Sequence, residues 1–154
     1  MMMTPAGSEH GRVAINIGAA LRDFVKQHSL GVVWGAETGF LIEQDPDTVR
    51  APDVAFVRRN RMPDPMPTEG FFPGTPDLAV EVLSPSDRAS EVFDKVEQWL
   101  DSGAIAVWVL DPVRKTVAVY NRTSPVTTLG LSDTLSDETL LPAFNLPVAE
   151  IFAF

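Results

Sequence analysis

The chain has 154 residues, of which 45% are apolar and 21% are charged, and it contains no cysteine. This composition is typical of a folded globular domain, so disorder along the whole chain and fibrous structure are excluded, and we expect one domain over residues 1–154. Without cysteine there can be no disulfides, thiolate zinc sites or iron–sulfur clusters. With two histidines a single chain cannot build a three-histidine zinc site, so a hard cation such as Mg²⁺ is the metal that fits best.

The formal net charge of −9 argues against a protein that coats nucleic acid or anionic membranes nonspecifically. No window of the sequence approaches the ~20 apolar residues of a membrane span, and the first residues lack the pattern of a secretory leader. We therefore expect a cytoplasmic protein without a membrane partner.

Helical spacing of apolar residues predicts a first helix over residues 8–28. A second helix is predicted after the SPSD segment, with Ser84 or Ser86 as its N-cap and Gly103 at its end. The closing VAEIF segment reads as one helical turn.

Short runs rich in Val, Ile and aromatic residues predict the strands. The runs at 30–36 and 38–43 suggest a β-hairpin, and residues 58–76 hold five prolines and two glycines and are therefore expected to form a long loop. The fold class expected is α/β (α+β): a mixed central sheet flanked by helices, in the order α-β-β-β-β-α-β-β. The remaining predicted strands are 51–57, 77–83, 105–110 and 116–120.

Two acidic residues lie in apolar strand contexts, Asp53 in APDVAFV and Glu81 in DLAVEVL. A buried carboxylate needs a cation, hydrogen bonds or a raised pKa. If the two strands are antiparallel neighbours, the start of the first lies beside the end of the second, and Asp53 and Glu81 converge. Asp77 would lie at the opposite end, about 13 Å away along the strand.

Two carboxylates without a nearby histidine or cysteine suit one Mg²⁺, which accepts carboxylates, a backbone carbonyl and waters. Such an ion can activate water and stabilise the charge that develops at a phosphate. Lys95, on the helix that follows Glu81, is the candidate for an additional cation near the site, because its side chain can reach back toward the sheet.

The segments RAPDVAFV, PDLAVEVLSPSDR, EVFDKVEQWLDSGAIAVWVLDPVRKTVAVY and LPAFNLPVAEIF together resemble the Uma-two family of restriction-endonuclease-like proteins, within the PD-(D/E)XK nuclease superfamily. The resemblance covers nearly the whole chain. It implies a restriction-endonuclease-like core and a Mg²⁺-dependent DNA endonuclease in which Mn²⁺ can substitute. It also favours a homodimer, because a duplex has two strands to cut.

In that resemblance Asp53 takes the motif aspartate and Glu81 the acidic residue of the E-x-K element, with the Val82 carbonyl as a further metal ligand. Leu83 stands where the motif has lysine, and Lys95 takes over the role of that lysine. A glutamate of the first helix often joins such sites, and Glu9 is its nearest counterpart.

Each residue also has a structural interpretation. Asp53 and Asp77 can be strand-entry residues, Glu81 a carboxylate on an edge strand, and Lys95 a solvated lysine paired with Glu91 or Glu97. His10 is more typical of a surface or capping residue than of a base. Two other functions stay open: a catalytically inactive module for nucleic-acid or protein binding, and a sugar hydrolase that uses the carboxylate pair.

Four arginines surround the Asp53 strand and predict a basic patch where a phosphate backbone could lie, in a chain whose remaining segments are mostly acidic. The acidic total then predicts weak, salt-sensitive DNA binding that depends on a divalent metal. The four are Arg50, Arg58, Arg59 and Arg61.

Overall fold

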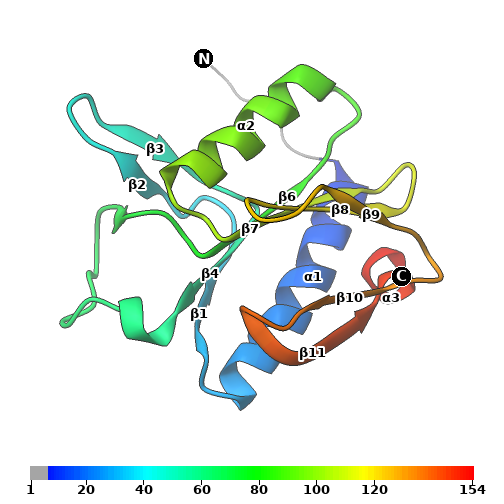
Figure 1. Cartoon of the computed structure of the whole chain (residues 1–154), viewed down its shortest axis with the longest axis horizontal. Coiled ribbons are helices and arrows are strands. Elements are labelled where there is room, and N and C mark those ends of the chain that lie inside the picture. The colour runs from blue at the N-terminus through cyan, green and yellow to red at the C-terminus, as the bar shows by residue number, and fades with distance from the viewer. Residues whose placement is uncertain (1–6) are drawn as a thin grey trace.

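A six-stranded mixed sheet forms the centre of the computed structural model, which describes residues 7–154 (Figure 1). Its strand order is β1-β4-β6-β7-β8-β9. All neighbours are antiparallel except β6 and β7, which are parallel. The strands are β1 (Gly31–Trp34), β4 (Val54–Arg58), β6 (Leu78–Val82), β7 (Ala106–Asp111), β8 (Thr116–Asn121) and β9 (Thr127–Leu129).

Helix α2 (Ala89–Ser102) connects the parallel strands β6 and β7, as a parallel pair requires a crossover connection. Every residue of β6 is buried, which agrees with its near-continuous apolar sequence and its place inside the sheet. The fold class predicted from the sequence, a mixed sheet flanked by helices, is confirmed. The sheet therefore buries a strand that carries one ionisable side chain, Glu81.

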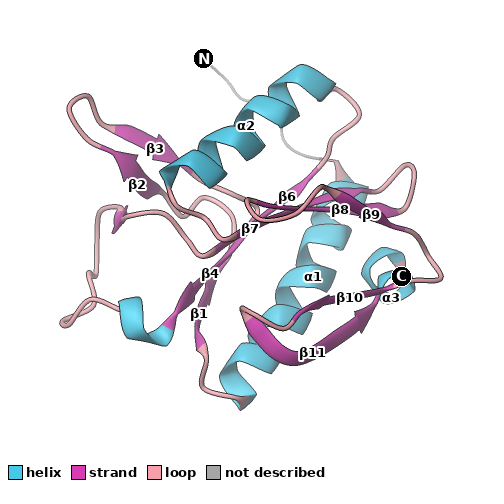
Figure 2. Cartoon of the chain, in the orientation of Figure 1, coloured by secondary structure: helices cyan, strands magenta, loops and turns pink. Residues whose placement is uncertain are grey.

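The helices cover opposite faces of this sheet (Figure 2). Helix α1 (Ser8–Gln27) and the short α3 (Val148–Phe152) pack on one face, against alternate residues of β6 that include Leu78 and Val80. Helix α2 covers the other face, where Ala79 belongs to the core. Because side chains alternate along a strand, Glu81 projects toward α2.

The first helix has the predicted bounds, with Val13, Ile17, Leu21 and Val25 on its buried stripe. The second ends as predicted, at Gly103, whose φ of 126° is favoured by glycine. It begins later than predicted, at Ala89. The segment before it forms a turn in which the Asp87 carboxylate accepts from the Ser84 N–H at 2.7 Å, so neither serine caps the helix.

The predicted hairpin of residues 30–36 and 38–43 is wrong. Strand β1 pairs with β4, and β2 (Phe40–Glu43) pairs with β3 (Thr48–Arg50) and β5 (Phe72–Pro73) in a separate three-stranded sheet. Phe40 packs on Phe72 of β5 with ring centroids 5.4 Å apart, which favours the pairing of β2 with β5. It meets Trp34 of β1 edge to face at 6.0 Å, so β1 and β2 are joined by side chains and not by strand pairing. Four predicted strands between α1 and α2 thus become six.

The predicted strand 51–57 is present as β4 but begins later, at Val54, and the separate short strand β3 precedes it at Thr48–Arg50. After β9 the chain forms a two-stranded sheet of β10 (Thr134–Asp137) and β11 (Leu141–Pro147). In the part of the chain that the structure describes, no helix is both long and apolar enough to cross a membrane.

The proline-rich segment between β4 and β6 contains one short 3₁₀ turn, η1 (Arg59–Arg61), and the two residues of β5. It is held by Asp77, which is 3% exposed. One carboxylate oxygen of Asp77 lies 3.0 Å from the Arg61 guanidinium, and the other accepts from the Arg58 N–H at 2.7 Å. Asp77 therefore stabilises the loop and its junction with the sheet.

We expect Asp77→Ala to lower the free energy of unfolding by about 3 kcal/mol, because it leaves a half-buried guanidinium and a backbone N–H without their partner. Urea denaturation measures this change. Glu69→Ala, which removes an exposed carboxylate from the same segment, is the control and should change stability by less than about 0.5 kcal/mol. Equal effects of the two substitutions would contradict this role for Asp77.

Candidate active site

The register of β4 and β6 brings Asp53 and Glu81 together. The two strands are antiparallel, and Val54 lies opposite Val80. Asp53, which precedes Val54, therefore lies opposite Glu81, which follows Val80. The backbone N–H of Asp53 donates to the Val80 carbonyl at 3.1 Å. The convergence inferred from the sequence is therefore present in the fold.

One oxygen of Asp53 is held by the backbone of the neighbouring strand, since the Val82 N–H donates to Asp53 Oδ2 at 2.7 Å. In a strand the N–H and C=O of one residue point to the same side. The Val82 carbonyl is thus directed to the side of β6 on which Asp53 lies. This places two carboxylates and one carbonyl at the same end of the sheet.

Glu81 lies beneath α2, with a side chain that is 12% exposed. Its Oε1 accepts from the Trp99 indole N–H at 3.3 Å, and its Oε2 lies 3.7 Å from Lys95 Nζ. Burial raises the pKa of Glu81 to about 7 against the opposing effect of Lys95, and the nearby Asp53 raises it further. A cation bound beside the two carboxylates would offset both unfavourable effects.

Lys95 is the only lysine or arginine within 4.0 Å of the Glu81 carboxylate in the part of the chain described. Its side chain remains 53% exposed, so the ammonium group lies where the site opens to solvent. Glu91, which could have paired with it, interacts with Arg88 at 3.9 Å instead. The lysine expected from the sequence therefore lies beside Glu81, although it comes from the following helix.

His10, which the sequence suggested to be a surface or capping residue, lies at this site. Its Nε2 lies 3.4 Å from Asp53 Oδ2, and its side chain is 16% exposed. It comes from the first turn of α1, which packs on the face of the sheet opposite α2. The spacing of the α1 stripe gave no signal for it, because the contact depends on how far the helix extends past the strand ends.

Two further candidates take other positions. Glu9 has a 55% exposed side chain that lies 3.9 Å from Arg12. Asp77 lies at the far end of β6, where it holds Arg61. Neither forms a hydrogen bond or ion pair with the Asp53 or Glu81 side chain. The site therefore consists of Asp53, Glu81 and Lys95, with His10 and Trp99 in contact with it.

The donor set suits a hard cation that keeps much of its water. Within residues 7–154 no group of three or more histidine, aspartate and glutamate side chains is arranged to hold a metal ion. Two carboxylates and the Val82 carbonyl are nevertheless the kind of partial set that Mg²⁺ accepts, since it retains several waters. A hollow of about 420 Å³ lies beside the site, and its lining includes Glu9, His10, Leu83, Asp111 and Arg114.

The basic patch predicted from four arginines is not formed. Arg50 lies at the Asp53 end of β4, where its Nε donates to Gln98 on α2 at 2.7 Å. Arg58, Arg59 and Arg61 follow at the other end of the strand, and Arg61 is engaged by Asp77. Because β4 is extended, its whole length separates Arg50 from the other three arginines.

The family model described as "Putative restriction endonuclease", Uma2, matches residues 1–149, and the chain belongs to this family. The fold is similar to the crystal structure of a "putative nuclease belonging to DUF820" from Anabaena variabilis, with a TM-score of 0.83 and 18% sequence identity. The match covers 99% of this chain and 84% of that one. No curated protein matches the sequence.

The raised pKa of Glu81 predicts how stability depends on pH. The folded state holds the proton up to about pH 7, whereas the unfolded state releases it near 4.5, so burial of the charged form costs stability as pH rises between these values. We expect Glu81→Gln to stabilise the fold by up to about 3 kcal/mol at pH 8, with little difference at pH 4.

Urea denaturation of both proteins at the two pH values measures this difference. Glu91→Gln, an exposed glutamate on α2, is the matched control and should show no pH-dependent gain. A Glu81→Gln effect of the same size at both pH values would show that burial does not raise this pKa.

Proposed function

We propose that this protein is a metal-dependent endonuclease that hydrolyses DNA phosphodiester bonds with a metal-activated water. The observation that carries the proposal is the placement of Asp53 and Glu81 side by side at the ends of β4 and β6, with Lys95 Nζ 3.7 Å from Glu81. Membership of a family described as restriction endonucleases supports a nuclease and a nucleic-acid substrate.

Asp53, Glu81 and the Val82 carbonyl would hold Mg²⁺, for which Mn²⁺ can substitute. The ion would supply a water of lowered pKa and positive charge beside the scissile phosphate. The chain's own residues then have separate tasks. Val82 N–H fixes the orientation of Asp53, and Trp99 directs one oxygen of Glu81 while leaving the other toward Lys95.

Lys95 would place its ammonium where negative charge develops on the phosphate or would polarise the attacking water. Its exposure leaves it accessible to a substrate that approaches from solvent. A phosphate held between Lys95 and the carboxylate site would be positioned for cleavage. We further propose a cytoplasmic homodimer, which would present two such sites to the two strands of a duplex.

Three substitutions test the site residues separately. We expect Asp53→Asn, Glu81→Gln and Lys95→Met each to lower the Mg²⁺-dependent cleavage rate of plasmid DNA by about 100-fold or more, since each removes a charge from the reacting centre. Circular dichroism checks the fold. Glu97→Gln, a charge removed from the exposed face of α2, should cleave at the wild-type rate. Wild-type cleavage by the Lys95 or Glu81 variant would refute the assignment.

The alternative function, a catalytically inactive binding module, draws support from Leu83 at the motif's lysine position and from the small number of side-chain ligands. Metal binding separates the two functions. Calorimetry should detect Mn²⁺ binding to the wild-type protein and its loss in Asp53→Asn. An absence of binding by the wild-type protein would favour the binding module.

A further inference from the structure

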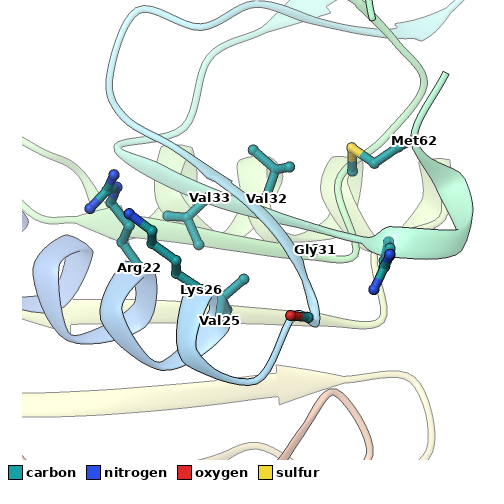
Figure 3. A pocket seen from close by; sticks show the side chains of 9 residues that line it. Arg22, Val25, Lys26, Gly31, Val32, Val33 and Met62 are labelled. Carbon is teal, nitrogen blue, oxygen red and sulfur yellow. The ribbon is translucent and has the colours of Figure 1, made fainter. Parts of the chain in front are cut away.

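A second hollow, of about 450 Å³, lies between α1, β1 and η1 at the opposite end of β4 from the carboxylate site. Gly31 of β1 is opposite Arg58, and Asp53 precedes Arg58 by five residues, so about 17 Å of extended strand separates the two sites. Figure 3 shows the hollow from close by. Its lining consists of Arg22, Val25, Lys26, Ser29, Gly31, Val32, Val33, Arg59 and Met62.

The lining carries three cations and no acidic residue. Within the described residues, Arg22, Lys26 and Arg59 form no ion pair within 4.0 Å. Several other lysine and arginine side chains lie within that distance of a carboxylate, among them Arg61 and Lys95. All three are exposed. In a chain with a net charge of −9, three unneutralised cations around one hollow mark a place that attracts an anion.

The hollow lies along the open edge of the central sheet. Strand β1 is the first strand of the sheet and pairs with β4 alone. The Leu30 carbonyl accepts from the Arg59 N–H at 2.9 Å and therefore faces β4. The backbone groups of successive residues of a strand face opposite sides, and the N–H groups of Gly31 and Val33 therefore point away from β4, toward the open edge. These donors lie beside the three cations.

The same cations disfavour two other occupants of this edge. Arg22 and Lys26 extend from α1 toward Val33 in Figure 3, and long basic side chains at a sheet edge oppose the addition of another strand. A second copy of the chain, paired symmetrically through β1, would bring like charges together. An anion with several charges along its length fits better.

We propose that Arg22, Lys26 and Arg59 form a phosphate-binding pocket that holds the nucleic-acid backbone at the other end of β4 from the carboxylate site, at least about 17 Å away along the strand. This inference rests on the proposed function, since it assigns the pocket to the nuclease substrate. A span of about 17 Å corresponds to about five base pairs of duplex, so a duplex of two helical turns is long enough to reach both sites. The apolar lining of Val32 and Met62 would face sugar rather than phosphate.

The test measures the affinity of a fluorescent duplex of about two helical turns by anisotropy, with Ca²⁺ in place of Mg²⁺ so that the carboxylate site can hold a cation, between about 50 and 200 mM KCl. We expect Lys26→Gln to weaken binding several-fold and to lower the slope of log Kd against log salt by about 0.9, and Arg22→Gln/Lys26→Gln to lower it by about twice that. The charge-preserving Lys26→Arg should keep the wild-type slope.

Lys115→Gln, which removes one exposed cation from the β7–β8 turn, controls for net charge. An equal loss of slope in Lys115→Gln and Lys26→Gln would overturn the pocket, as would wild-type affinity in the double variant or no DNA binding by the wild-type protein. Binding of an oligoglutamate peptide in place of the duplex would also overturn it and would identify a peptide-binding edge.

Cleavage in Mg²⁺, measured in parallel, separates this inference from the proposed function. A wild-type protein that cleaves DNA while the pocket variants bind it normally refutes the pocket alone. A wild-type protein that binds DNA through these cations but never cleaves it refutes the nuclease and leaves the pocket in place.

Discussion

The burial of Glu81 in the central strand is the constraint on which the rest of the site depends. A carboxylate at the centre of a sheet is costly to ionise, and its pKa is raised to about 7. The fold surrounds it with Trp99 and Lys95 from α2 and with Asp53 from β4. The βαβ connection supplies the first two, because α2 begins where β6 ends and crosses back over that face.

The two ends of the β4–β6 pair use acidic residues in different ways. At one end Asp77 is neutralised by Arg61 and by a backbone N–H, and it joins the proline-rich segment to the sheet. At the other end Asp53 and Glu81 approach each other with Lys95 and His10 at their margins. The same dipeptide, Pro-Asp, begins both strands in the sequence. Its surroundings decide whether the carboxylate stabilises the fold or remains accessible for chemistry.

The net acidity of the chain is compatible with a nucleic-acid partner because its cations are not evenly placed. Arg22 and Lys26, four residues apart on α1, line the same hollow as Arg59 from the segment after β4. Binding through a few such contacts depends strongly on salt. A metal ion at the carboxylate site would remove part of the remaining repulsion between the protein and a phosphate backbone.

The sequence by itself determined the buried strand 78–82, both main helices and the convergence of Asp53 with Glu81, because apolar periodicity and antiparallel connection are local patterns that survive in the fold. Tertiary structure alone decided the pairing of β1 with β4, the position of His10 and the separation of Arg50 from Arg59. These depend on contacts between segments distant in the chain, where aromatic packing and the length of an extended strand outweigh proximity in sequence.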